Sequence, residues 1–312
     1  MNDNLSHTPV LVGQAVEYLA INPSGIYVDC TLGGGGHSYE ILSHLNQDGK
    51  LIGIDWDEQA IGIANKKLLS SGKRYSIVND NFAHIKDILA AENIKYVNGF
   101  LLDLGISSFQ IDVPERGFSY LAEGPLDMRM SHACKRSAAA LLNTESESQL
   151  AWLFYNYGEE KRSRIIAKAI VKKRQHGIIK TTKQLTEVIE SVTPYRKRIK
   201  TLARCFQAIR IATNLEMDNL QIFLNKVTDL LVVGGRLVTI SFHSMEDRLI
   251  KDIMYKQTNP CECPLELPHC ICGKKPKMKI LTKRIVKPTA DEIRANPRCR
   301  SSKLRAYERI EN

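Results

Sequence analysis

The residue types with the most obvious chemical use lie between positions 26 and 55. Four consecutive glycines, Gly33 to Gly36, follow a short apolar run that ends in an acid, Asp29, and they precede a helical pattern that begins near His37. Glycines let the backbone turn sharply and approach a ligand, and the first turn of a helix offers unpaired N–H groups. Asp55 comes 19 residues after Gly36, a spacing that suits a carboxylate accepting hydrogen bonds from ribose hydroxyls. This segment predicts a site for a nucleotide-type cofactor.

The details of the turn distinguish between cofactors. The third glycine of the dinucleotide fingerprint G-x-G-x-x-G is replaced by Ser38, which argues against a nicotinamide dehydrogenase. An acid four residues before the first glycine, as Asp29 is before Gly33, is typical of enzymes that use S-adenosylmethionine. A tight turn with no ligand, as found in any α/β protein, is the alternative interpretation of this stretch alone.

The flanking patterns predict the elements that position these residues. Candidate strands are residues 26–30, 51–55, 75–78, 99–104 and 236–242. Helical patterns at 57–69 and 83–92 separate members of this set, and such alternation is typical of a doubly wound parallel α/β sheet with helices on both faces.

The alternation of strands and helices then stops. Residues 112–212 carry helical runs only, so we expect them to form a helical domain inserted into a discontinuous cofactor domain of residues 1–111 and 213–312. Gly234 and Gly235 are expected to end a helix just before the fifth strand. Apolar runs at 278–286 and 303–310 are expected to add an antiparallel pair at the sheet edge.

Acids follow the predicted strands where ligands bind in open α/β sheets. Asp29, Asp55, Asp80 and Asp103 all fall at such carboxyl ends. Asp103 closes the fourth strand and is our first candidate for a carboxylate that accepts a hydrogen bond from an amino or hydroxyl group of a substrate. The alternative for Asp103 is a helix N-cap.

Charge and composition bound the partners. The net charge is +10, but residues 1–110 hold 12 acids and 7 bases, whereas residues 161–200 hold 13 bases and 2 acids and residues 273–312 hold 13 bases and 4 acids. Two strongly basic segments favour a nucleic-acid partner over a merely solvated surface. There is no apolar run of the roughly 18 residues that span a membrane, and no sign of a protein partner. We expect a cytoplasmic protein whose eight cysteines are reduced unless they bind metal.

Four of those cysteines form two close pairs. Cys261 and Cys263 are separated by six residues from Cys270 and Cys272, and His269 lies beside them. Such a group could ligate zinc, although the spacing within each pair is one residue rather than the usual two to four. Free reduced thiols are the alternative.

Longer motifs identify a family. The chain closely resembles the bacterial small-subunit ribosomal RNA cytosine-N4 methyltransferases (the RsmH or MraW family) over nearly its whole length. The matching motifs are His7-Thr-Pro-Val-Leu, Asp29-Cys-Thr-Leu-Gly-Gly-Gly-Gly-His-Ser, Leu102-Asp-Leu-Gly-Ile-Ser-Ser, Glu115-Arg-Gly-Phe-Ser, Gly124-Pro-Leu-Asp-Met-Arg-Met, Phe206-Gln-Ala-Ile-Arg-Ile, Ser241-Phe-His-Ser-Met-Glu-Asp-Arg and Asn296-Pro-Arg-Cys-Arg-Ser.

The resemblance implies a methyltransferase fold with a helical insertion, S-adenosylmethionine as cofactor, and 16S ribosomal RNA of the small ribosomal subunit as partner. It implies methylation of the exocyclic amine of a cytidine in the decoding centre. It also implies cofactor contacts from seven residues: Gly35, Gly36 and His37 at the turn, Asp55 at the ribose, Phe82 against the adenine, and Asp103 and Gln110. The remaining alternative is a non-catalytic ribosome-assembly or RNA-binding factor that keeps a cofactor pocket.

The reaction itself needs an acceptor for the amine protons, because the lone pair of a cytosine amine is delocalised into the ring. Asp103 is the first candidate, with Ser107 or Ser108 near it. His243, just past the fifth strand, could contact the target base or accept a proton, or it could be a structural histidine.

The helical insertion supplies candidates for RNA contact. Those for phosphate contacts are Lys172, Lys173, Arg174, Arg196, Lys197 and Arg198. Tyr195 or Phe118 could stack on an unstacked base, with ordinary packing as the alternative.

Overall fold

The computed structural model describes residues 9–264 and 269–310 and divides the chain into two compact units. Unit 1 runs to Gly105 and resumes at Met217, and unit 2 comprises Ile106–Glu216. These bounds differ by a few residues from the predicted 111/112 and 212/213, so Gln110 belongs to unit 2. None of the helices in the described ranges combines the length and apolarity that crossing a membrane requires.

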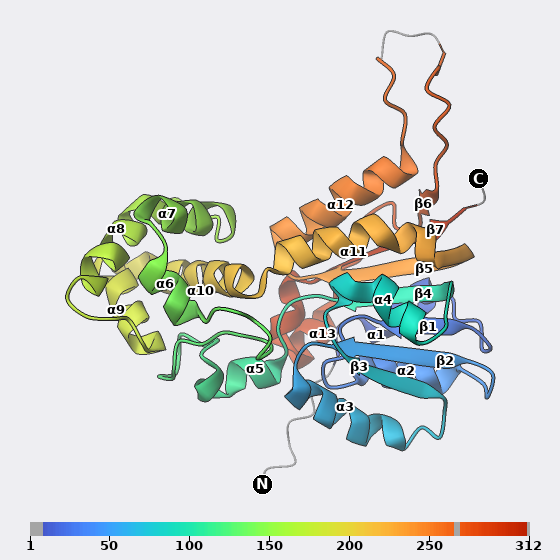
Figure 1. Ribbon diagram of the computed structural model, residues 1–312, viewed down its shortest axis with the longest axis horizontal. Helices are drawn as coiled ribbons and strands as arrows, with labels where there is room; N and C mark the ends of the chain where they lie inside the picture. Colours follow the sequence, from blue (N-terminus) through green and yellow to red (C-terminus); the bar gives the residue numbers. More distant parts are fainter. Residues whose placement is uncertain (1–8, 265–268, 311–312) are drawn as a thin grey trace. The chain divides into compact units, whose positions relative to one another are not determined.

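Unit 1 is built on one seven-stranded sheet with the order β3-β2-β1-β4-β5-β7-β6 (Figure 1). Its strands are β1 (Ile26–Asp29), β2 (Lys50–Asp55), β3 (Tyr75–Asn79), β4 (Val97–Asp103), β5 (Leu231–Ser241), β6 (Met278–Ile280) and β7 (Lys303–Arg309). The first five pair in parallel, and β7 lies antiparallel between β5 and β6. The expected parallel sheet with a late antiparallel pair at its edge is thus confirmed.

The expectation for Gly234 and Gly235 was wrong. Helix α11 (Glu216–Leu230) ends at Leu230 and β5 begins at the next residue, so both glycines lie within the strand. Gly234 has φ of 80°, and the register between β4 and β5 shifts between Val97 and Gly99. A glycine that takes left-handed angles inside a strand produces such an irregularity, which sequence alone does not distinguish from a helix end.

Helices cover both faces of this sheet. Besides α11, whose first residue belongs to unit 2, they are α1 (Val12–Leu19), α2 (Gly36–His44), α3 (Glu58–Leu69), η1 (Phe82–His84), α4 (Ile85–Ala91), α12 (Ser244–Thr258), α13 (Ala290–Ala295) and η4 (Pro297–Ser301). Along β4, Phe100 and Leu102 join the core under α4, α11 and α12, whereas Leu101 joins the core under α1, α2 and α3. This alternation between two buried faces is the doubly wound arrangement that the sequence predicts.

Unit 2 is helical. Its elements are α5 (Ser108–Asp112), η2 (Pro114–Arg116), α6 (Ala138–Thr144), α7 (Glu147–Asn156), α8 (Ser163–Arg174), α9 (Thr182–Ser191), η3 (Tyr195–Lys197) and α10 (Arg198–Asn214). Within residues 106–216 the only β pairing is an isolated bridge between Pro125 and Thr181. A separate core holds these helices together, with Phe154, Ile166 and Ile209 fully buried in it.

Candidate functional site

The glycine turn joins β1 to α2 in a form that only glycine accommodates. Gly33 and Gly35 have φ of 50° and 75°, and Gly35 is the N-cap of α2. A Cβ at Gly35 would lie 3.2 Å from Cα of Ala64, and one at Gly36 would lie 2.7 Å from Cγ of Pro9. The backbone therefore packs closely against its neighbours at these two positions, where only glycine fits.

Asp29 holds the start of α2 against the end of β1 through hydrogen bonds. It is buried at the end of β1, where its Oδ2 accepts the Ser38 hydroxyl at 2.7 Å and its Oδ1 accepts the Thr31 N–H at 3.2 Å. Burial raises its pKa to about 6, although these two hydrogen bonds favour the charged form. The acid that suggested the cofactor class thus serves to hold the turn.

Asp55 connects the end of β2 to the same turn. Its Oδ2 accepts the N–H of Gly33 at 2.7 Å and its Oδ1 accepts the N–H of Asp57 at 2.8 Å. Burial is the main cause that raises the pKa of Asp55 to about 6. The predicted ribose-binding carboxylate therefore lies at the glycine turn, where a nucleoside bound there would meet it.

Asp103, at the end of β4, combines burial with an unmet hydrogen-bonding capacity. Its N–H donates to Oγ1 of Thr31 at 2.6 Å, which ties it to the β1 end. Its Oδ1 is buried and accepts no hydrogen bond from the described residues. Burial, and then the nearby charges of Asp29 and Glu246, raise the pKa of Asp103 well above its ordinary value. Such an oxygen is suited to accept a hydrogen bond from a bound ligand.

His37 lies between Asp103 and the segment that precedes α1. Its Nε2 is 2.9 Å from the carbonyl oxygen of Val10, to which it must donate, and its Nδ1 is 3.6 Å from Oδ2 of Asp103. The ring is buried. The predicted cofactor residue His37 thus lies beside the candidate catalytic carboxylate.

The loop after β3 carries the predicted adenine contact. Oδ1 of Asp80 accepts the N–H of Asn81 at 2.6 Å and lies 2.8 Å from Nδ1 of His84, which orders the loop. Phe82 is half-buried, and its ring meets that of Phe223 on α11 edge to face at 5.7 Å. One side of Phe82 is therefore fixed by the core of unit 1.

Gln110 and Ser107 form a capping box at the start of α5 in unit 2. The Ser107 hydroxyl accepts the Gln110 N–H at 3.2 Å, and Oε1 of Gln110 accepts the Ser107 N–H at 3.1 Å. The Ser108 side chain lies outside what the structure describes. Local capping thus accounts for part of the bonding of Gln110, and its predicted cofactor contact stays a prediction.

His243 caps α12. Its Nδ1 accepts the N–H of Glu246 at 3.3 Å, its Nε2 lies 3.0 Å from Oε1 of Glu246, and the two residues form a capping box. Glu246 itself is buried and accepts the N–H of Phe242 at 2.8 Å. This geometry supports the structural alternative for His243, and its catalytic role stays a prediction.

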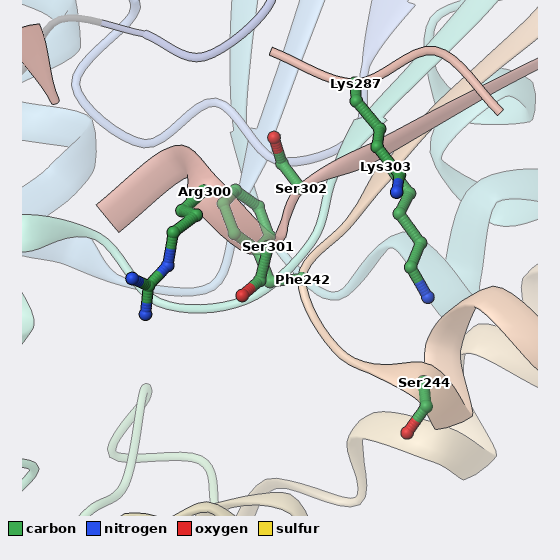
Figure 2. Close-up of a pocket in the computed structure, with 7 residues that line it drawn as sticks. All are labelled: Phe242, Ser244, Lys287, Arg300, Ser301, Ser302 and Lys303. Atoms are coloured by element: carbon green, nitrogen blue, oxygen red, sulfur yellow. The ribbon is translucent and has the colours of Figure 1, made fainter. Parts of the chain in front are cut away.

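Sequence reasoning did not single out a basic pocket of about 280 Å³ that the structure shows beside this cap (Figure 2). Its lining residues are Phe242, Ser244, Lys287, Arg300, Ser301, Ser302 and Lys303. Lys303 pairs with Asp247, whereas Lys287 and Arg300 make no ion pair with a described acid. The buried Oγ of Ser302 has no described partner. The signal was present in the charge of residues 273–312 and in the Asn296–Ser301 motif.

Of the residues of unit 2 that the sequence proposes for RNA contact, some have structural roles and others remain candidates. Nη1 of Arg174 donates to the carbonyls of Leu142 and Glu145, so this guanidinium holds a helix end. Phe118 is buried in the core of unit 2, which contradicts a stacking role for its ring. Tyr195 is 83% exposed and remains a candidate for stacking.

Comparisons with known proteins cover both units. The profile of the MraW methylase family matches residues 4–310. The ribosomal RNA small subunit methyltransferase H of Halothermothrix orenii is 47% identical over 99% of this chain and 100% of its own length. The protein of the same name from Carboxydothermus hydrogenoformans is 45% identical over 98% of each chain. Among solved structures, an rRNA methylase from Streptococcus thermophilus aligns with a TM-score of 0.43 and 13% identity, covering 98% of this chain and 100% of that one.

Proposed function

This chain belongs to the MraW methylase family, and we propose that it transfers a methyl group from S-adenosylmethionine to the N4 amine of a cytidine in the decoding centre of 16S ribosomal RNA. The relatives described above are named as ribosomal RNA small subunit methyltransferases. The observation that carries the chemical part of the proposal is the buried Oδ1 of Asp103, which accepts no hydrogen bond from the described residues and lies on the strand next to the glycine turn.

The residues of unit 1 fit S-adenosylmethionine. At Gly35 and Gly36 a Cβ would meet Ala64 and Pro9 of the chain itself, whereas at Gly34 it would meet only Cγ2 of Ile63 at 3.9 Å, so the open part of the turn is at Gly34. Asp55 sits where ribose hydroxyls could replace or join its backbone partners, and Phe82 offers a ring face near the neighbouring strand end. When bound, the cofactor supplies an electrophilic methyl group on a sulfonium centre.

Asp103 would accept a hydrogen bond from the cytidine amine. Its free oxygen would draw an N–H toward it and localise the nitrogen lone pair, which makes the amine a better nucleophile. A carboxyl with a raised pKa is also a stronger proton acceptor than an ordinary aspartate. His37, held by Val10, lies beside this carboxyl group, and the bond from the Asp103 N–H to Thr31 fixes the end of the strand.

The basic pocket would hold the backbone of the RNA. Lys287 and Arg300 line the pocket and bring positive charge without described acidic partners. Phosphate contacts position an RNA strand without reading its sequence. The pocket lies at the end of β5, the strand next to β4 and Asp103.

The test is methyl transfer from labelled S-adenosylmethionine to small ribosomal subunits that lack the modification, followed by digestion to nucleosides. Label in N4-methylcytidine is the expected result. The Asp103→Asn protein is the matched control, because it keeps the shape of the side chain. Cofactor binding without any labelled nucleoside would overturn the proposal and favour an assembly factor that retains the pocket.

A further inference from the structure

The cysteine arm is residues 259–277, of which residues 259–264 continue from the end of α12 and residues 269–277 lead into β6 (Figure 1). Its described part carries Cys261 and Cys263 on the outgoing side and Cys270 and Cys272 on the returning side. The methyl-transfer site described above uses none of these residues. The four thiols are therefore available for a role separate from methyl transfer.

The four sulfur atoms converge on one point. The Sγ of Cys270 lies 3.5 Å from that of Cys261, 3.8 Å from that of Cys263 and 3.4 Å from that of Cys272. All four lie within 4.8 Å of one another. Four thiolates bound to one zinc ion at about 2.3 Å are about 3.8 Å apart in a regular tetrahedron, whereas a disulfide requires about 2.05 Å. The spacing suits a shared ion.

A second feature of the arm points to the same conclusion. None of its described residues is buried, and Ile271, at the level of the cysteines, is 79% exposed. A segment without a hydrophobic core needs another source of order, and a metal ion is one of the few available. The N–H of Ile271 donates to Sγ of Cys263 at 3.3 Å, a backbone contact of the kind that stabilises a metal-bound thiolate.

The charges around the cluster also suit a thiolate site. One Zn²⁺ bound by four thiolates carries a net charge of about −2. Lys274 and Lys275 directly follow the second pair, and Lys274 also pairs with Glu262, which stands between Cys261 and Cys263. Positive side chains thus lie on the arm where they can offset the charge of the site.

We propose that Cys261, Cys263, Cys270 and Cys272 bind one Zn²⁺ ion as a tetrahedral structural site that fixes the cysteine arm. Zinc fits better than a hard cation because all four ligands are sulfur. Each thiol loses its proton on binding, so four Zn–S bonds form and the protons pass to solvent. No open position remains at the ion, so the role is structural rather than catalytic.

The test compares three proteins purified under reducing conditions without chelator and measured by plasma mass spectrometry. The unchanged chain and His269→Ala should hold about one zinc per chain, and Cys270→Ser should hold less than about a tenth of that. His269 is the matched control because it neighbours Cys270 and does not belong to the sulfur cluster. Replacement by Co²⁺ should give the thiolate charge-transfer absorption in the first two proteins only.

Other results would overturn the proposal. Less than about a tenth of a zinc per chain after reconstitution with ZnCl₂ would do so, as would iron in its place. Titration showing that the four thiols are joined in disulfides would do so as well. A separate readout is limited proteolysis, in which chelation should expose cleavage within residues 259–277 while the rest of the chain stays intact. Unchanged cleavage would contradict a structural role for the ion.

Discussion

His37 places its Nδ1 3.6 Å from Oδ2 of Asp103 while its Nε2 donates to the carbonyl oxygen of Val10. Nε2 therefore carries a proton, and Nδ1 is the ring nitrogen that faces the carboxyl group. The negative neighbours Asp29 and Glu246, together with burial, favour the protonated form of Asp103. The pair thus links the protonation of the candidate acceptor to a ring that the N-terminal segment holds.

The pH dependence of methyl transfer should reflect this carboxyl group. The pKa of Asp103 is raised, so the carboxylate that accepts the amine proton forms only above the ordinary range of an aspartate. The single-turnover rate should rise with pH through that raised pKa. Asp103→Asn should lower the rate by about 100-fold or more and abolish this rise.

The control for that measurement is Asp48→Asn, which removes an exposed acid of unit 1. It should keep both the rate and its pH profile. An Asp103→Asn protein with full turnover would show that no charge is needed at this position. Cofactor affinity, measured by calorimetry, separates a loss of binding from a loss of chemistry.

The glycine turn offers a matched pair of substitutions. Gly35→Ala forces φ of 75° on alanine and places its Cβ 3.2 Å from Ala64, which should cost about 1–3 kcal/mol of unfolding free energy. Gly34→Ala meets only Ile63 Cγ2 at 3.9 Å and should change stability little. Denaturant unfolding and cofactor titration of both variants make the comparison. Equal stability of the two would contradict a structural need for glycine at position 35.

Asp29 should make the stability of the chain depend on pH. Its folded pKa is about 6 against an ordinary 3.8, so the folded state holds this proton more tightly than the unfolded state. The unfolding free energy should therefore fall as pH rises between these values, by on the order of 3 kcal/mol for this group. Asp29→Asn keeps an acceptor for Thr31 and removes the charge. Its stability relative to the unchanged chain should improve from pH 4 to pH 7.5 in urea unfolding, and a constant difference would contradict the prediction.

Much of the fold could be predicted because period and spacing encode it directly. The strands that end at Asp29, Asp55 and Asp103 alternate with helical patterns. The turn after the first strand needs left-handed backbone angles that glycine adopts most readily. The geometry of the site could not be predicted in the same way. That Asp29 bonds Ser38, or that Asp103 keeps one oxygen without a described partner, depends on where the fold points individual side chains, which period and spacing do not encode.

The side chains near the end of β5 also could not be interpreted correctly from sequence alone. The position of His243 after the fifth strand makes it a candidate proton acceptor. In the structure its Nδ1 accepts the N–H of Glu246, a local capping contact that many polar residues can make. The basic pocket was missed because its members come from separate segments that only the fold brings together, such as Phe242, Lys287 and Arg300.

That pocket gives the last prediction. Arg300→Ala and Lys287→Ala each remove a positive charge that has no described acidic partner, so each should raise the KM for the ribosomal substrate and leave cofactor affinity unchanged. Each should also lower the slope of log binding constant against log salt by about 1, because one phosphate contact is lost. Lys283→Ala removes an exposed lysine outside the pocket and serves as the control. Equal effects of all three variants on KM would show that the pocket contributes only general positive charge. A weaker affinity for the ribosomal substrate in the Arg300 and Lys287 variants alone would place the RNA backbone at the end of β5.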